Sequence, residues 1–276
     1  MMPAGTTDQK KRLRLTALLL FSVAVLLLAA AMPPISQPQA YHQFADQRTL
    51  FGIPNFMNVA SNLAILLSGL AGLVFLWHSF RVSYQRQTQQ KFVTSAEYWP
   101  YLVLFASVIL TAPGSAYYHW APDNNSLLWD RLPIAVGVTA LLAAVLSERI
   151  HPKLGVRALP ILVLMGAGSV IYWYMGEQRG NGNLNFYIVI QFYSLLLVVL
   201  LSLLLPSRYT RGHDIYKVIG LYALAKLAET LDQQIFDLGQ VISGHTAKHL
   251  LAAWAIWWIV KMLQKRSFVD HKEIPG

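Results

Sequence analysis

Five residues have the types and spacing of a catalytic metal centre. Ser115 and His119 are four residues apart, and so are His245 and His249, which places each pair on one helix face. Asp130 follows His119 after a short interval. Three neutral imidazoles with one open position form the ligand set of a catalytic zinc. The chain has no Cys, so imidazole and carboxylate are the strong ligands that it offers.

Each of these residues also has an ordinary structural interpretation. A histidine at a helix end can bond to water or to a carbonyl group. Ser115 can pack between helices or bond to a carbonyl of its own helix. Asp130 can cap a helix N-terminus, with Arg131 as its counter-ion. The combination of the five, rather than any one of them, indicates a metal site.

The composition indicates that these residues lie in a membrane protein. Of 276 residues, 55% are hydrophobic and 13% are charged, against about 25% charged in a soluble protein. The net charge of +9 would suggest a nucleic-acid partner in a soluble domain, but here the basic residues lie between apolar runs. We therefore expect a membrane protein without a nucleic-acid partner. The absence of Cys excludes a disulfide framework, iron–sulfur ligation and a Cys nucleophile.

Eight apolar stretches are long enough to span a bilayer, which takes about 20 residues. They are residues 15–32, 56–80, 99–119, 126–146, 158–175, 184–205, 215–236 and 244–263. The long runs lack the alternation of barrel strands. The sequence therefore predicts an all-α, polytopic membrane helical bundle, with eight helices in one domain.

The distribution of Lys and Arg predicts the orientation of the bundle. With the N-terminus inside, nearly all basic residues fall in inner segments, as the positive-inside rule requires. Both termini are then cytoplasmic, and residues 33–54, 121–125, 176–183 and 237–243 form outer loops. The first run could instead be a cleaved signal peptide, but its length favours a retained helix. The metal-ligating histidines then lie near the outer, non-cytoplasmic face.

The seventh stretch is unusually polar for a membrane helix. Lys226, Glu229 and Asp232 follow one another at intervals of three, which puts them on one face of a continuous helix. They form either a buried ion pair with an outward end or a set of groups that orients a metal-bound imidazole. Lys248 lies about 100° around its helix from the histidines and either binds headgroups or snorkels outward.

Three segments together resemble the alkaline ceramidase family, part of a superfamily of seven-helix membrane hydrolases that includes the adiponectin receptors. They are residues 114–119 (Gly-Ser-Ala-Tyr-Tyr-His), 129–133 (Trp-Asp-Arg-Leu-Pro) and 244–249 (Gly-His-Thr-Ala-Lys-His). Residues 58–62 (Asn-Val-Ala-Ser-Asn) also resemble the Asn-x-x-Ser-Asn opening of the family's first core helix. The resemblance implies a seven-helix hydrolase core at 55–264. Residues 1–54 then hold an N-terminal tail, an extra helix and an outer loop, and residues 265–276 a cytoplasmic tail.

The resemblance implies a zinc-dependent hydrolase that cleaves the amide bond of a ceramide-like lipid from the bilayer with a metal-activated water. His119, His245 and His249 would hold the zinc. Asp130 would hold or deprotonate the water and later protonate the leaving amine. Ser115 would donate a hydrogen bond to the water or to the developing oxyanion.

The outer loop departs from the eukaryotic members of that family, which fits a prokaryotic-type member. Those members carry an acidic calcium-binding loop with a Glu just before the Asn-x-x-Ser-Asn motif. This chain has Asn55 there, and Asp46 is the one carboxylate of the preceding loop. Because calcium prefers several carboxylate oxygens, a calcium site is doubtful.

Three other functions compete with the amidase. A related zinc hydrolase could act on a different lipid ester or amide. A non-enzymatic haem b protein could use histidines of two helices as axial ligands. A receptor or transporter could use the carboxylates of the seventh stretch as a relay, although the sequence has no inverted repeat to support it.

Overall fold

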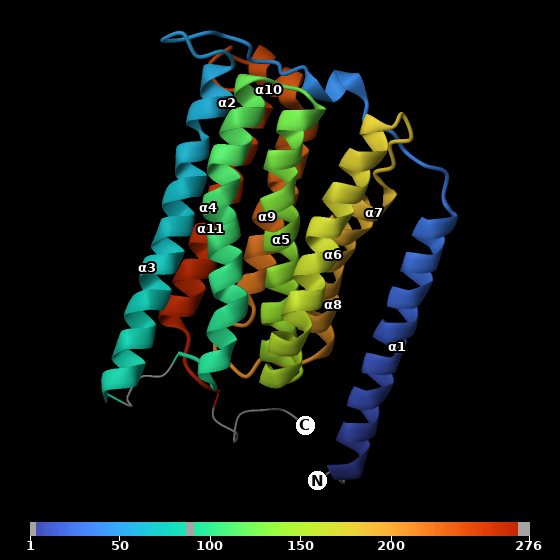
Figure 1. The fold of residues 1–276 in the computed structure, drawn as a ribbon. Helices are drawn as coiled ribbons and strands as arrows, with labels where there is room; N and C mark the ends of the chain where they lie inside the picture. Colours follow the sequence, from blue (N-terminus) through green and yellow to red (C-terminus); the bar gives the residue numbers. More distant parts are fainter. Residues whose placement is uncertain (1–3, 87–90, 270–276) are drawn as a thin grey trace.

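The computed structural model describes residues 4–86 and 91–269, which form a bundle of upright helices (Figure 1). The described residues contain no strand, only two isolated bridges. The helices of the first half are α1 (Ala4–Ala31), η1 (Gln39–His42), α2 (Phe56–Ala60), α3 (Asn62–Arg86), η2 (Ser95–Glu97), α4 (Tyr98–Trp120) and α5 (Asn124–Arg149). Those of the second half are α6 (Pro152–Gln178), α7 (Asn185–Ile188), the π-helical turn η3 (Val189–Tyr193), α8 (Ser194–Leu204), α9 (Asp214–Thr230), α10 (Asp232–Asp237) and α11 (Gly244–Lys265).

All eight predicted stretches are helical, which confirms the all-α bundle, but three of them are not continuous α-helices. The second is broken at Ser61, between α2 and α3. The sixth contains the π-turn η3, in which one extra residue is accommodated. The seventh is broken at Leu231, whose ψ of 29° ends α9 before α10 begins.

Six helical stretches of the described chain are long and apolar enough to cross a membrane. The helices α9 and α11 are not among these six, although both run along the bundle in Figure 1. Helix α9 has only 17 residues and carries several charges, and α11 carries His245, Lys248 and His249. These two helices are more polar because they contribute the ionisable groups of the candidate site.

Packing contacts join six helices in a closed circuit: α3 to α4, α4 to α5, α5 to α8, α8 to α9, α9 to α11, and α11 back to α3. Helix α6 packs on α5, and α5 is the most enclosed of the six membrane-length helices, with 72% of its apolar stretch buried. In α1 that share is only 6%, and Figure 1 shows α1 standing apart from the bundle. The arrangement is a seven-helix body with one peripheral helix, as predicted.

Two clusters of buried side chains form the core. The larger cluster fills the centre of the bundle, and the smaller lies near the end where α4 stops and α5 begins. Phe44, Tyr118, Leu127 and Trp173 belong to the smaller cluster, so the loop after α1 is packed onto the bundle rather than lying free.

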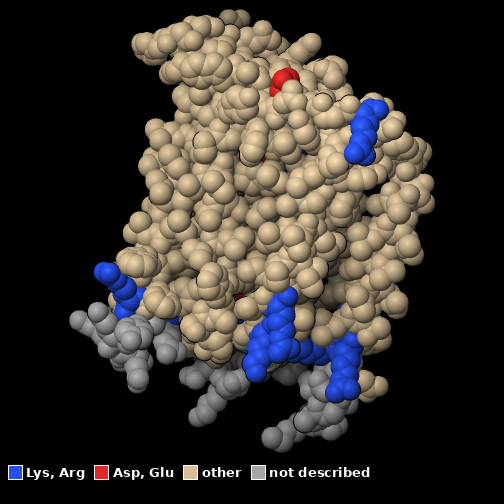
Figure 2. Space-filling model, in the orientation of Figure 1, with Lys and Arg blue, Asp and Glu red and all other residues tan. Residues whose placement is uncertain are grey.

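The two ends of the bundle differ in charge. Helix α1 begins and helix α11 ends at the lower end in Figure 1. The loops predicted to face outward join helices at the upper end. On the face drawn in Figure 2, the Lys and Arg side chains gather at the lower end, apart from one near the top. This asymmetry is the one on which the predicted orientation depends.

Candidate metal centre

Three buried imidazoles from two helices converge at the upper part of the bundle. His119 Nε2 lies 3.3 Å from His249 Nε2 and 3.2 Å from His245 Nε2. The three side chains offer ligand atoms that all lie within 4.8 Å of one another, and the residues are 0%, 5% and 3% exposed in chain order. The three predicted ligands are therefore brought together, and this group could hold a metal ion.

The start of α11 is held in place by α9 and α10. Ser243 caps α11 and accepts a hydrogen bond from Thr246 N. A Cβ on Gly244 would lie 2.1 Å from Ala228 O, so only glycine permits this approach. Asp232 Oδ1 accepts the backbone N–H of His245 at 2.7 Å. These contacts fix the first turn of α11, and the spacing of four then aligns His245 with His249.

The second nitrogen of each imidazole has its own environment. His249 Nδ1 lies 2.8 Å from Ser61 Oγ, and Ser61 in turn donates to Asn58 O. The Ser61 hydroxyl therefore accepts from Nδ1–H, which leaves the lone pair of His249 on Nε2, toward the other rings. His119 Nδ1 has no hydrogen-bond partner among the described residues. Asn55 Nδ2 donates to His119 O at 2.8 Å and so secures the end of α4.

Asp130 and Ser115 meet where α4 and α5 approach closely. The Ser115 hydroxyl hydrogen-bonds the Asp130 carboxylate, and both residues are buried. A Cβ on Gly114 would lie 2.2 Å from Trp129 O, so glycine allows this contact. The interpretation of Asp130 as a helix cap is wrong. Asp123 caps α5 by accepting Ser126 N, and that hydrogen bond lowers the pKa of Asp123.

The charged residues of the seventh stretch differ from the prediction in one respect. Glu229 forms the predicted ion pair with Lys226 and a second one with Lys248 Nζ at 2.8 Å. Because the helix breaks at Leu231, Asp232 does not continue their face. It binds the backbone of His245 and the N–H of Ala45 instead, so it orients a backbone rather than an imidazole.

Lys248 lies inside the bundle and does not snorkel outward. Its side chain is 17% exposed, and Nζ lies 2.8 Å from both Glu229 Oε1 and His245 Nε2. The 100° offset along α11 therefore turns Lys248 toward α9. A cation bound between the imidazoles would displace the ammonium from His245, and Glu229 already holds it on the other side.

The loop between α1 and α2 covers the histidines from above. The Phe44 ring packs edge-on against His119 and His245, with centroids 4.7 and 4.9 Å away, and Phe44 is 5% exposed. Asp232 Oδ2 holds the loop through Ala45 N at 2.9 Å. The sequence does not indicate a role for Phe44, because nothing in the local pattern connects it with residues 75 or more positions away.

Asp46 and Asn55, the two residues discussed for a calcium site, both have partners within the protein. Both carboxylate oxygens of Asp46 are bonded by the Arg48 guanidinium, at 2.8 and 2.6 Å. Burial opposes ionisation of Asp46, but these hydrogen bonds outweigh it and hold its pKa below the usual value. Asn55 acts as a donor to His119 O, a role that a carboxylate could not fill.

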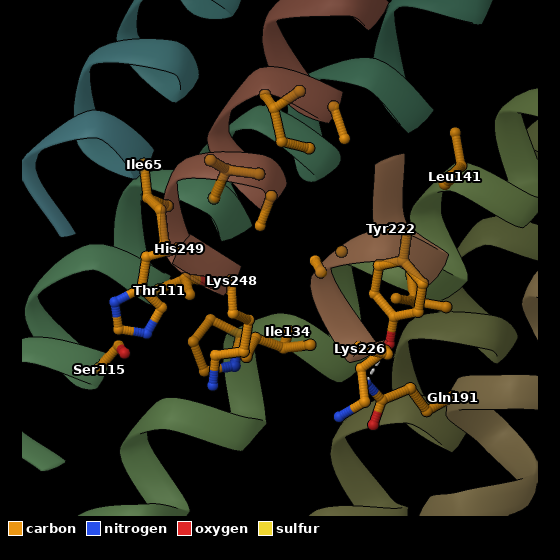
Figure 3. A pocket seen from close by; sticks show the side chains of 18 of the residues that line it. Ile65, Thr111, Ser115, Ile134, Leu141, Gln191, Tyr222, Lys226, Lys248 and His249 are labelled. Atoms are coloured by element: carbon orange, nitrogen blue, oxygen red, sulfur yellow. Dashed lines mark hydrogen bonds between the residues drawn. The ribbon is translucent and has the colours of Figure 1, made fainter. Parts of the chain in front are cut away.

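A cavity extends from His249 into the bundle (Figure 3). Its polar part is lined by Ser115, Asp130, Lys248 and His249, and the picture shows Ser115 and His249 close to Lys248. Its apolar part is lined by residues such as Leu104, Val108, Leu141, Leu195 and Ile259. Gln191, which the π-turn places on this wall, donates to Tyr222 OH at 2.6 Å. The cavity thus has both a polar part and a larger apolar part.

A scan against protein-family models finds no match to the chain, and a search of the curated proteins finds none either. The structure therefore establishes a membrane-type helical bundle with a buried group of three histidines that could hold a metal. What the site does must follow from its own chemistry.

Proposed function

We propose that the chain is a zinc-dependent membrane hydrolase that cleaves the amide bond of a ceramide-like lipid. One observation carries the proposal: His249, one of three converging imidazoles, lines a cavity together with the buried carboxylate of Asp130, and the rest of that cavity is mostly apolar. The motif resemblance to the alkaline ceramidase family supports the same activity. The orientation predicted from Lys and Arg places the site near the non-cytoplasmic face and both termini in the cytoplasm.

The donor set fits a zinc ion. Nitrogen ligands about 2.0–2.1 Å from a tetrahedral zinc lie about 3.3–3.4 Å apart, and the separations from His119 Nε2 are 3.2 and 3.3 Å. Without a cation, His119 Nε2 would face two neighbouring nitrogens in a buried site. Because Nε2 carries at most one proton, it could donate a hydrogen bond to only one of them. Three imidazoles without a fourth protein ligand leave a position open, as catalytic zinc sites do.

Zinc bound there would lower the pKa of a coordinated water and polarise a substrate carbonyl. Asp130 accepts the proton that water loses as its oxygen attacks the carbonyl carbon. When the carbon–nitrogen bond breaks, Asp130 passes that proton to the leaving amine, so that a carboxylic acid and an amine result. Ser115 holds the carboxylate in place through its hydroxyl.

The remainder of the cavity would hold the lipid. Its apolar lining suits an acyl chain, and burial there stabilises the chain by about 0.8 kcal/mol per methylene group. Phe44 closes the site above the histidines and limits the entry of bulk water from that side. A related zinc hydrolase with another lipid ester or amide substrate would use the same geometry, and a panel of lipids separates the two.

The histidine geometry disfavours a haem protein. Axial histidines stand on opposite faces of a macrocycle, whereas the Nε2 atoms of His119, His245 and His249 lie within hydrogen-bond distance of their neighbours. No gap between the rings could admit a porphyrin. Glu229 is occupied by two lysines, which also leaves little support for a carboxylate relay.

Metal content and lipid-amide hydrolysis of the purified protein test the proposal. We expect about one zinc per chain, and loss of zinc and activity when His245 and His249 are both changed to Ala. The matched control changes His78 and His213, two exposed histidines, to Ala and should keep both. Full zinc retention in the first double variant would refute the ligand assignment, and zinc without hydrolysis of any amide lipid would refute the activity.

A further inference from the structure

Arg131 is an unusual residue for the wall of this cavity. It is 5% exposed, and its guanidinium lies over the rings of Trp173, Tyr187 and Tyr41, at 4.4, 4.9 and 5.1 Å from their centroids. This aromatic cage holds the side chain in one place through cation–π contacts. Arg131 lines the same cavity as His249 and follows Asp130 directly in the chain.

Arg131 interacts with the Tyr41 hydroxyl and, at longer range, with the Asp130 carboxylate, but it has no paired counter-charge within the described chain. None of the ion pairs among the described residues includes it. Its Nη1 is buried and has no hydrogen-bond partner among those residues. Burying a guanidinium without a counter-charge is costly, and an unpartnered N–H group on a cavity wall indicates a missing acceptor.

The other charged groups of the cavity do not supply that acceptor. Its wall carries the cations Arg131, Lys226 and Lys248 and the carboxylates of Asp130 and Glu229. Glu229 pairs with both lysines, and Asp130 bonds to Ser115. The cavity therefore has an excess of positive charge, and a divalent metal at the histidines would add to it.

We infer that the amide lipid cleaved at this site carries an anionic headgroup, a carboxylate or a phosphate, which binds Arg131. The inference rests on the proposed function and narrows its substrate from neutral ceramide-like lipids to acidic ones. The acyl chain takes the apolar chamber, so the amine side of the lipid lies at the polar end, beside Arg131. An N-acyl amino acid is the simplest such lipid, because its carboxylate is one carbon away from the amide nitrogen.

Binding of two uncleavable lipids to the metal-loaded protein tests this inference. Both are keto analogues of N-dodecanoylglycine, in which a methylene group replaces the amide N–H; one is the free acid and the other its primary amide. They differ in charge and hardly in shape. By calorimetry in detergent, the acid should bind on the order of tenfold to a hundredfold more tightly than the amide, as expected for charge-assisted hydrogen bonds.

Variants of Arg131 then test whether this residue causes the preference for the acid over the amide. Arg131→Gln should bring the two affinities together by weakening the acid alone, and Arg131→Lys should keep part of the preference. The control is Arg179→Gln, which removes an exposed arginine next to α6, outside the cavity, and should change nothing. The comparison on the unmodified protein decides the question even where an Arg131 variant does not fold.

Equal affinity for acid and amide in the unmodified protein would overturn the inference. So would dodecanoic acid binding as tightly as the keto acid with the same dependence on Arg131, since the anion site would then serve the released acyl product. An analogue with a phosphate headgroup that matches the keto acid would support it. Cleavage of N-dodecanoylglycine and of neutral ceramide is measured separately, so a failure of the proposed hydrolysis is distinguishable from a failure of charge selection.

Discussion

His249 is oriented by a hydroxyl from the junction between α2 and α3. Ser61 Oγ accepts its Nδ1–H at 2.8 Å and thereby directs the Nε2 lone pair toward the metal position. We expect Ser61→Ala to weaken zinc binding about 10–100-fold, because groups that orient a metal-bound imidazole typically contribute that much. Competition with a zinc chelator measures the change. Ser68→Ala, which removes a buried hydroxyl bonded to Ile65 O elsewhere in α3, is the matched control and should bind zinc normally.

In the proposed mechanism Asp130 moves protons and does not bind the metal. We expect Asp130→Asn to keep zinc and to lower turnover about 10²–10⁴-fold, since the amide cannot accept a proton. Metal content and amide hydrolysis on this one variant are the measurements. Loss of zinc would make Asp130 a ligand instead, and unchanged turnover would remove it from the mechanism.

The sequence predicts the metal-site residues themselves better than the contacts that hold them in place. His119, His245 and His249 are found because spacing and membrane depth are properties of the sequence. The spacing of Asp232 predicts a possible role toward an imidazole, but Asp232 binds a backbone N–H, because the break at Leu231 turns it away. Such contacts depend on tertiary packing, which spacing along one helix does not contain.

Helices α4 and α5 approach closely beside Asp130. A Cβ on Gly114 would meet the carbonyl group of Trp129, and a backbone group cannot move aside as a side-chain end can. We expect Gly114→Ala to destabilise the protein by about 1–3 kcal/mol, the usual cost of overpacking, and to separate Ser115 from Asp130. Thermal unfolding in detergent measures the loss.

Gly168→Ala in α6 is the control, because nothing lies within 4 Å of the added Cβ. It should leave the unfolding temperature unchanged or raise it slightly, since alanine favours a helix over glycine by about 0.5–1 kcal/mol. Equal destabilisation by both changes would mean that the α4–α5 contact is not the tight point of the bundle.

The existence of each helix follows from the sequence, while its interruptions do not. Hydropathy reports that a stretch can lie in the membrane. It does not reveal that one helix ends and the next begins at Ser61, or that Leu231 leaves helical geometry. The π-turn around Gln191 is another example, since an extra residue in an apolar run does not change its composition. Each of these three irregularities occurs where a polar side chain reaches the site or its cavity.

The whole molecule has one strongly basic end, and this asymmetry predicts its orientation in the membrane. Reporter fusions after Arg157 and Lys265 should lie in the cytoplasm, and fusions after Pro38 and near Gly182 should lie outside. The structure places the two groups of positions at opposite ends of the bundle (Figure 1). An external C-terminus would invert the molecule and place the histidines near the cytoplasmic face.

The fold class could be predicted at this scale because composition and apolar run length determine it. The packing circuit could not, since which helices become neighbours depends on side-chain fit. The peripheral position of α1 is the exception. The chain has eight predicted helices, so a seven-helix core leaves one of them outside.

The Phe44 ring over the histidines would also control the exchange of a metal bound to them. An ion beneath it can leave only after the loop has lifted, which requires breaking the Ala45–Asp232 hydrogen bond and exposing an aromatic ring. The residence time of the ion is then set by loop opening as well as by its bonds to nitrogen. The metal would enter most easily during folding, before the α1–α2 loop has closed, and would afterwards remain as a nearly permanent part of the protein.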